Sequence, residues 1–166
     1  MLTVLLLLMA GHFDLFPPQG EKALVLLFIR TDCPISNRYA PELQRLYEHY
    51  SPKGIDFRLV YVEPGITVAA AEEHRREYGY TIPAVVDPGH EYVKRGRAGI
   101  TPEASVFVYG ELVYHGRIDD RYVAIGKERP RALHHDLEEV LAAVLARKAI
   151  PRRETTAIGC AIENLK

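Results

Sequence analysis

The apolar positions in the first part of the chain change from an unbroken run to a helical stripe. Residues 23–29, ALVLLFI, form a continuous apolar run, which is typical of a strand buried on both faces of a sheet. Beyond them, apolar side chains recur at helical spacing and predict a helix over residues 36–50. The sequence SPKG at residues 51–54 is expected to end this helix. The first unit is therefore a buried strand that leads into a helix.

The rest of the chain repeats this alternation and closes with a hairpin and a helix. Strands are expected at residues 57–62 and 83–86, separated by a helix that begins after Thr67 and stops at Gly79. Two more strands, at residues 105–109 and 112–118, are joined by Gly110-Glu111, a two-residue loop with glycine first. A final helix over residues 131–147 is indicated by the stripe Leu133, Leu137, Val140, Leu141, Val144 and Leu145.

This order of elements predicts an α/β domain. Strands that alternate with helices pair in parallel through right-handed crossovers, and the hairpin adds antiparallel strands at one side. The expected architecture is a central mixed β-sheet flanked by helices on both faces. We expect residues 23–147 to form this domain, with residues 1–22 as an N-terminal segment and residues 148–166 as a tail that carries Cys160.

Charge and composition narrow the range of partners. The 21 Lys and Arg residues nearly balance the 22 Asp and Glu residues, so no electrostatic feature indicates nucleic acid as a partner. Residues 1–10, MLTVLLLLMA, form an apolar run too short to cross a bilayer, and no stable membrane span is expected. This run is either the apolar core of an export signal or a buried first strand.

Cys33 lies where the buried strand ends and the helix begins, and Pro34 follows it. Proline suits the first helical position, so the Cys33 sulfur is expected at the helix N-terminus, where free N–H groups favour a thiolate. The Asp32 carboxylate opposes this effect if it lies close. Arg30 lies on the same face of an alternating strand as Asp32 and can offset its charge. The alternative is an inert, buried thiol, but the junction favours a reactive one.

Several segments give the chain a family resemblance. Residues 33–36, CPIS, resemble a CxxC motif in which Ser36 replaces the second cysteine; Pro41 resembles the kinking proline of the thioredoxin helix; and Thr101-Pro102 resembles the cis-proline of the thioredoxin active site. The segments TDCPISNRYAPEL, GRIDDRY and TTAIGCAI resemble a bacterial redoxin-like family related to the alkyl hydroperoxide reductase and thiol-specific antioxidant proteins. The resemblance implies a thioredoxin fold with a redoxin-type insertion, around residues 89–97, before the cis-proline.

The resemblance also implies thiol chemistry. The leading hypothesis is a thiol–disulfide oxidoreductase in which the Cys33 thiolate attacks a disulfide or an oxidised thiol, with resolution by Cys160 or by an external thiol. A peroxidase is an alternative, although Thr31-Asp32-Cys33 is one residue shorter than the Thr-x-x-Cys of peroxiredoxins. A thioredoxin-fold module that binds a metal or a protein is a third possibility. Protein or small-molecule thiols and disulfides are the expected partners, and this chemistry favours a periplasmic or exported location over the cytoplasm.

Further candidates are expected around Cys33. Ser36 is positioned either to donate a hydrogen bond to the Cys33 thiolate or only to provide polarity at the helix start. Arg117, with Thr101 and Asp119, is a candidate for binding substrate, but an ion-pair network of Arg117 with Asp119 and Asp120 is slightly favoured.

Cys160 and the histidines complete the candidates. Cys160 lies ten residues beyond Ile150, a length of chain that extends over roughly 33 Å. It is therefore either the partner of Cys33 or an unpaired thiol in a packed tail. The seven histidines show no metal-ligand spacing, so no metal and no other cofactor is expected.

Overall fold

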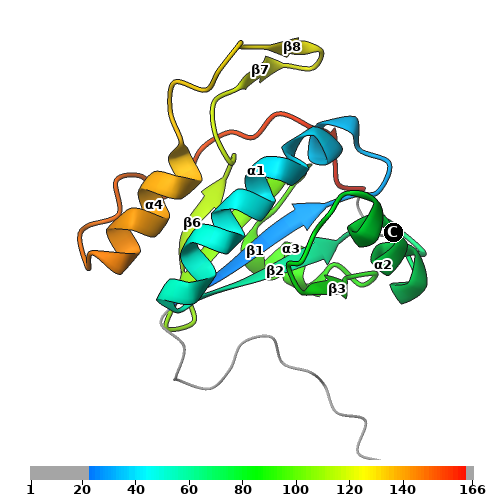
Figure 1. Ribbon diagram of the computed structural model, residues 1–166, viewed down its shortest axis with the longest axis horizontal. Coiled ribbons are helices and arrows are strands. Elements are labelled where there is room, and N and C mark those ends of the chain that lie inside the picture. The colour runs from blue at the N-terminus through cyan, green and yellow to red at the C-terminus, as the bar shows by residue number, and fades with distance from the viewer. Residues whose placement is uncertain (1–22, 164–166) are drawn as a thin grey trace, which may run out of the picture.

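A five-stranded mixed sheet forms the centre of the computed structural model, which describes residues 23–163 (Figure 1). Its middle strand β1 pairs in parallel with β2, and β2 pairs in parallel with β3. On its other side β1 pairs antiparallel with β5, and β5 antiparallel with β6. In sheet order the strands are β3 (Ala84–Val86), β2 (Ile55–Tyr61), β1 (Ala23–Ile29), β5 (Glu103–Val108) and β6 (Glu111–Gly116).

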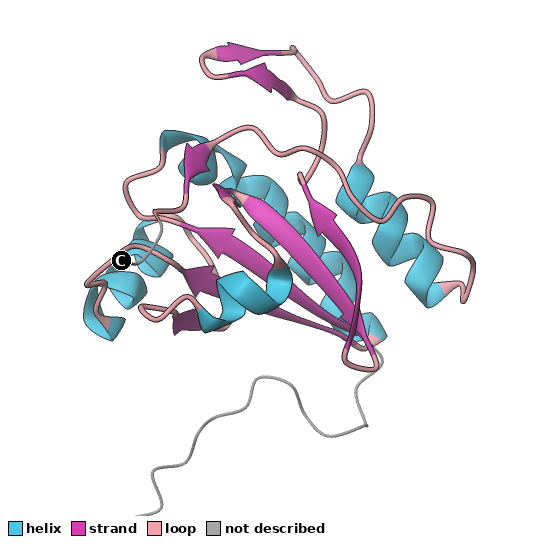
Figure 2. Ribbon diagram, turned by 180° about the vertical axis from the view of Figure 1, so that it is seen from behind, coloured by secondary structure: helices cyan, strands magenta, loops and turns pink. Residues whose placement is uncertain are grey.

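The alternation of side chains along β1 divides the interior into two cores. Val25, Leu27 and Ile29 contribute to the core that contains α1 (Pro34–Tyr50) and α4 (Asp136–Leu145). That core also includes Ala71 of α2 (Val68–Glu77). The intervening residues Leu24, Leu26 and Phe28 contribute to the second core, which contains Val93 of α3 (Glu91–Gly96). Figure 2 shows α3 on the opposite face of the sheet from α1. The expected α/β fold, with helices on both faces and an insertion before the cis-proline, is confirmed.

Local sequence explains where the first helices begin and end. Cys33 is the N-cap of α1 and Pro34 is its first residue, a position where the missing N–H costs no hydrogen bond. After α1, a 3₁₀ turn over Ser51–Lys53 is closed by Gly54, whose φ is 87°. The hydroxyl of Thr67 caps α2 by accepting a hydrogen bond of 3.2 Å from the Ala70 amide.

Two local expectations are wrong. The hairpin between β5 and β6 turns at Tyr109 and Gly110, with φ of 49° and 82°, rather than at Gly110-Glu111. Glycine is therefore the second residue of the loop, and both residues have the positive φ of a type I′ turn. The last helix starts at Asp136, not at residue 131, because the backbone amides of Leu133 and His134 bind the Asp120 carboxylate at 2.6 and 2.9 Å. As a result Leu133 is 61% exposed instead of joining the apolar stripe.

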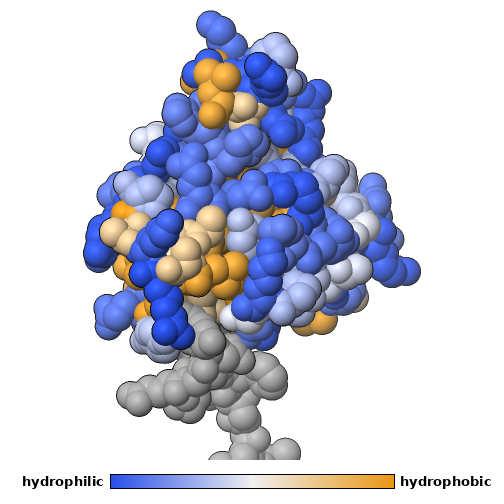
Figure 3. Space-filling view, turned by 60° about the vertical axis from the view of Figure 1, so that its left-hand side comes forward, coloured by the Kyte–Doolittle hydropathy of each residue, from blue (hydrophilic) through white to orange (hydrophobic). Residues whose placement is uncertain are grey.

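A small hairpin that the sequence pattern did not predict projects from the domain between β6 and α4. It consists of β7 (Tyr122–Ala124) and β8 (Lys127–Glu128). It is joined to α1 by an ion pair of 2.7 Å between Arg38 and Glu128. Figure 3 shows a largely hydrophilic face with an apolar group at the projecting end, where Ile125 is 70% exposed.

The last described residues, 151–163, here called the tail, cross the sheet edge and return toward the start of α1 (Figures 1 and 2). They form β9 (Cys160–Ala161), which pairs antiparallel with β4 (Ile100–Thr101). Among residues 23–163, no helix has the length and apolar character needed to cross a membrane. The expectation of an export signal or first strand at residues 1–22 lies outside the described residues.

Candidate active site

Cys33 lies at the junction of β1 and α1 and is completely buried. Its Sγ accepts a hydrogen bond from the Ser36 amide, 3.5 Å away, as the N-cap of α1. The same sulfur lies 3.2 Å from the carbonyl oxygen of Thr101, and the Thr101-Pro102 peptide bond is cis. The strand end, the helix N-terminus and the cis-proline loop therefore meet at the Cys33 sulfur, as the motifs predicted.

Cys160 is the disulfide partner of Cys33 in the structure, across 127 positions of sequence. Their Cα atoms are 6.1 Å apart, which lies within the usual range for a disulfide. In the β4–β9 pair Cys160 lies opposite Thr101, whose hydroxyl donates a hydrogen bond of 3.3 Å to the Cys160 carbonyl oxygen. The structure thus brings together Cys33, Cys160 and Thr101, with Pro102 buried next to Thr101.

Close backbone contacts fix the path of the tail to this site. The first is at Thr155, whose amide donates to the His115 carbonyl at 3.2 Å and whose hydroxyl accepts from the Arg117 amide at 3.0 Å. A Cβ on Gly116 would lie 2.4 Å from the Thr155 carbonyl oxygen. The second contact is at Gly159, where a Cβ would lie 2.0 Å from the Thr101 carbonyl oxygen. These two glycines let the tail come close enough for Cys160 to reach Cys33.

Arg30 neutralises the acidic residue that precedes Cys33. Its guanidinium forms a two-pronged ion pair with the Asp32 carboxylate, with distances of 2.9 and 3.0 Å. Hydrogen bonding to the Asp32 carboxylate, which accepts from Arg30, is the main reason why the pKa of Arg30 is raised, although partial burial opposes it. Arg30 also donates to the Ala161 carbonyl at 3.3 Å, so it links the Cys33 loop to the tail.

Ser36 and Thr31, both candidate catalytic residues near Cys33 in the sequence, lie at the site, but Ser36 contacts Cys33 through its amide and not through its hydroxyl. The Ser36 amide reaches the Cys33 sulfur, whereas its buried hydroxyl has no hydrogen-bond partner within residues 23–163. The Thr31 amide donates to the Glu63 carboxylate at 2.8 Å, and the Thr31 carbonyl accepts from the Asn37 side chain at 3.0 Å. Thr31 therefore holds the loop through its backbone.

Arg117 and Asp119 have other partners. Arg117 donates to Asp136, a completely buried carboxylate, at 2.6 Å, instead of pairing with Asp119 or Asp120. Asp119 accepts hydrogen bonds from the Tyr39 hydroxyl and from the Arg121 amide. Burial, together with the bond to Asp119, raises the pKa of Tyr39. In the described part of the chain, neither Arg117 nor Asp119 has a hydrogen bond or ion pair with either cysteine.

His74 takes part in a buried chain of hydrogen bonds that sequence reasoning missed. Tyr61 Oη lies 2.9 Å from His74 Nδ1, and His74 Nε2 lies 3.0 Å from the Asn37 side-chain oxygen. Asn37 in turn donates to the Thr31 carbonyl in the Cys33 loop. These bonds fit a neutral imidazole that donates from Nε2 and accepts at Nδ1. Burial lowers the pKa of His74, which favours this neutral form. The position of His74 on α2 carries no motif, so only the structure identifies it.

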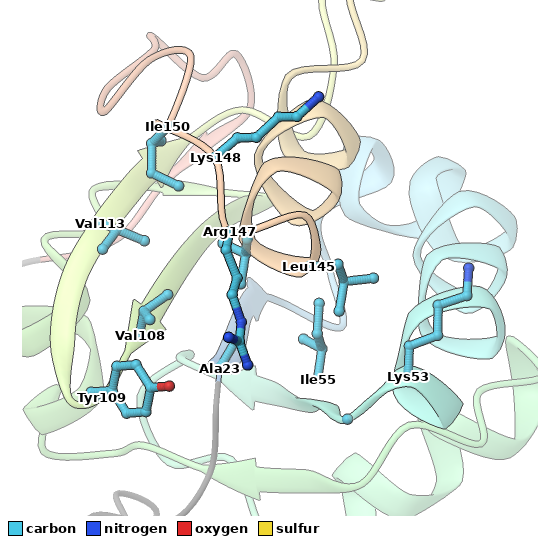
Figure 4. Close-up of a pocket in the computed structure, with 12 residues that line it drawn as sticks. Ala23, Lys53, Ile55, Val108, Tyr109, Val113, Leu145, Arg147, Lys148 and Ile150 are labelled. Atoms are coloured by element: carbon cyan, nitrogen blue, oxygen red, sulfur yellow. The ribbon is translucent and has the colours of Figure 1, made fainter.

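Two other features lie apart from the cysteines. A cavity of about 650 Å³ opens beside Ala23 and Ile55, with Arg147 across it (Figure 4). It lies at the start of β1, whereas Cys33 follows its end. Separately, Glu42, His135 and Glu138 have potential metal-ligand atoms within 4.8 Å of one another. The Arg45 guanidinium already binds both of these carboxylates, at 2.7 and 2.8 Å.

Fold and site together define a thioredoxin-fold protein with a cysteine pair beside a cis-proline. Residues 11–113, more than half of the chain, match the AhpC/TSA family. The chain therefore belongs to the AhpC/TSA family, and the resemblance drawn from its motifs is confirmed. A comparison with curated proteins finds no match.

Solved structures share this fold. An uncharacterized conserved protein from Geobacillus kaustophilus is 25% identical, with a TM-score of 0.75 over 89% of this chain and 80% of that chain. A hypothetical protein from Sinorhizobium meliloti 1021 is also 25% identical, with a TM-score of 0.74 over 87% of this chain and 80% of its own. A secreted Mycobacterium tuberculosis disulfide oxidoreductase, described as homologous to E. coli DsbE, is 17% identical with a TM-score of 0.53, over 77% of this chain and 84% of that chain. At this identity the last one shows the fold alone.

Proposed function

We propose that this protein is a thiol–disulfide oxidoreductase whose redox pair consists of Cys33 and Cys160. The observation that carries the proposal is the pairing of these two sulfurs at the N-terminus of α1, beside the cis Thr101-Pro102 bond. Cys160 supplies from the tail the second thiol that the CPIS motif lacks.

The site provides a partner for each state of the Cys33 sulfur. When the disulfide is reduced, the Ser36 amide and the helix N-terminus stabilise a Cys33 thiolate. If that thiolate takes up a proton, the Thr101 carbonyl oxygen is positioned to accept the S–H hydrogen bond. Stabilisation of both states suits a pair that cycles between disulfide and dithiol.

The substrates in this proposal are thiols and disulfides of proteins or small molecules. The exchange is a two-electron transfer: two substrate thiols become a disulfide while the Cys33–Cys160 disulfide becomes two thiols, or the reverse. The Mycobacterium tuberculosis neighbour, which shares the fold, is called a disulfide oxidoreductase.

Membership of the AhpC/TSA family favours one second candidate, a thiol peroxidase. In that scheme a peroxide oxidises a cysteine to a sulfenic acid, and the second cysteine condenses with it to form the disulfide. The two functions share the Cys33–Cys160 disulfide and differ only in the oxidant that produces it.

The proposal is tested by equilibrating the protein in glutathione buffers of different redox state and mapping its peptides by mass spectrometry. We expect a reversible change of two mass units, with the Cys33 and Cys160 peptides linked in oxidising buffer. Disulfide formation driven faster by hydrogen peroxide than by oxidised glutathione would favour the peroxidase. Peptides that never link would overturn both functions.

A further inference from the structure

The two cysteines of the pair differ in how exposed they are. Cys33 has no exposed surface, because it lies beneath the cis-proline loop and at the end of a fully buried strand. Cys160 is partly exposed and lies in the tail, where the next residue, Ala161, is exposed. A thiolate must touch the sulfur that it attacks, so exposure is the first property that favours attack at Cys160.

The surroundings of the two sulfurs also make Cys33 the better leaving group. When the bond breaks, the electron pair that stays on Cys33 is met by the Ser36 amide at the positive end of α1. Cys160 lies in a two-residue strand, β9, whereas Cys33 occupies the N-cap position of α1. In thiol–disulfide exchange, the sulfur that better stabilises negative charge leaves faster.

We infer that Cys160, and not Cys33, is the residue that forms the mixed disulfide with substrate. Cys33 is the buried sulfur that leaves when a substrate thiolate attacks Cys160, and in the reverse direction it is the thiolate that resolves the mixed disulfide. This inference rests on the proposed function and reverses the roles that the CPIS motif suggests. The tail therefore carries the reacting sulfur, and the thioredoxin-like motif supplies its partner.

The exchange balances as follows. A substrate thiolate attacks Cys160 Sγ, a new sulfur–sulfur bond forms, the Cys33–Cys160 bond breaks, and Cys33 leaves as a thiolate. A second substrate thiolate then attacks the substrate sulfur of the mixed disulfide and releases Cys160 as a thiolate. The products are one substrate disulfide and a reduced pair, which takes up protons from solvent. In the reverse direction the Cys160 thiolate attacks a substrate disulfide, and Cys33 resolves the product.

Contacts on both sides of Cys160 keep it in place during this exchange. On one side, the absence of a side chain at Gly159 allows the backbone to touch Thr101. On the other side, Arg30 donates to the Ala161 carbonyl, and the Ile162 amide donates to Gly99 at 2.9 Å. Cys160 is therefore presented by fixed backbone on both sides, at the surface of the site.

Two matched variants separate the roles of the cysteines. Each single variant, Cys33→Ser or Cys160→Ser, is mixed with excess oxidised glutathione. Intact-mass measurements then follow how fast an adduct of roughly 305 Da forms, which is the mass that exchange with one glutathione adds to the remaining cysteine. We expect Cys33→Ser to capture glutathione on Cys160 at least tenfold faster than Cys160→Ser captures it on Cys33. Equal rates, or faster capture by Cys33, would overturn the inference.

A measurement on the unchanged protein guards against altered folding of the variants. The reduced protein is treated with less than one equivalent of iodoacetamide, and the alkylated peptides are quantified. We expect the Cys160 peptide to carry at least ten times more label than the Cys33 peptide. Label mainly on Cys33 would contradict the inference and leave the oxidoreductase proposal standing. If neither cysteine exchanges with glutathione or takes label, both proposals fail.

Discussion

At the scale of single residues, Gly159 controls how the tail meets the cis-proline loop. We predict that Gly159→Ala pushes the tail away from Thr101, because the added Cβ would lie 2.0 Å from the Thr101 carbonyl oxygen. Backbone shifts of this kind cost about 1–3 kcal/mol. The oxidised protein should lose this amount of unfolding free energy in urea titrations, and the fraction of disulfide in a glutathione buffer should fall. Gly99→Ala is the matched control, since a Cβ there meets nothing within 4 Å.

A second prediction at the scale of single residues concerns how the contribution of His74 to stability depends on pH. Burial lowers its pKa, against the opposing charges of Glu63 and Glu77, so the folded protein holds a neutral imidazole. The unfolded chain protonates this histidine near pH 6.5 (about the value of a free histidine) and so binds more protons below that pH. The stability that His74 contributes is therefore fully present above about pH 6.5 and is lost as the pH falls toward the lower folded pKa.

The measurement is urea denaturation between about pH 5 and pH 8, a range chosen to bracket the histidine titration. His74→Gln should flatten the decline of unfolding free energy at low pH. His49→Gln, which changes an exposed histidine on α1, should keep the decline. A decline that is the same in all three proteins would show that His74 is not its source.

At the scale of elements, one buried carboxylate joins β6, α4 and the tail. Asp136, at the first residue of α4, accepts from Arg117 after β6 and from Arg152 at the start of the tail. We predict that Asp136→Asn lowers the unfolding free energy by about 3 kcal/mol, because it removes the buried charge that Arg117 and Arg152 share, while Arg152 keeps its ion pair with Glu139 at 3.1 Å. Arg38→Met is the control: it breaks the exposed pair with Glu128, which should cost less than about 1 kcal/mol. Equal losses would contradict a special role for Asp136.

Elements with a clear hydrophobic period, or with helix-capping and turn residues at their ends, could be predicted from the sequence. The apolar run of β1 and the helical stripe of α1 fall where expected, since alternate β1 residues share one core with α1 and the intervening ones fill the second core. The β7–β8 hairpin has exposed apolar residues and only five residues in its strands, so its sequence shows no alternation of apolar and polar positions that would predict a strand. Leu133 fits the helical period, but the amides around it bind Asp120 instead of continuing α4.

The site was predicted where motifs mark it and missed where only tertiary contacts do. Cys33 and Thr101-Pro102 stand at motif positions, and the structure places them together. The partner of Arg117 depends on how α4 docks, and the packing of His74 on the Cys33 loop depends on how α2 meets α1; neither leaves a local pattern. Cys160 could be proposed as a partner, but its pairing depends on the path of the tail.

At the scale of the whole molecule, the Cys33–Cys160 bond joins two residues that lie near opposite ends of the described chain. The bond closes a loop across 127 positions of sequence. In the chain-entropy view, a loop of this length stabilises the folded state by about 5 kcal/mol. We predict that reduction lowers the unfolding free energy by about this amount, as measured by urea denaturation with and without reductant. The Cys33→Ser/Cys160→Ser double variant should show no effect of reductant.

The position of the β7–β8 hairpin within this loop has one further consequence. The hairpin lies between the two cysteines in sequence, and Ile125 at its tip is 70% exposed, which makes it an accessible site for a protease. A single cut there opens this loop but does not separate the fragments, because the Cys33–Cys160 disulfide still joins them covalently. The nicked protein would therefore migrate as one species until it is reduced, and its redox state would decide whether the damage separates the fragments.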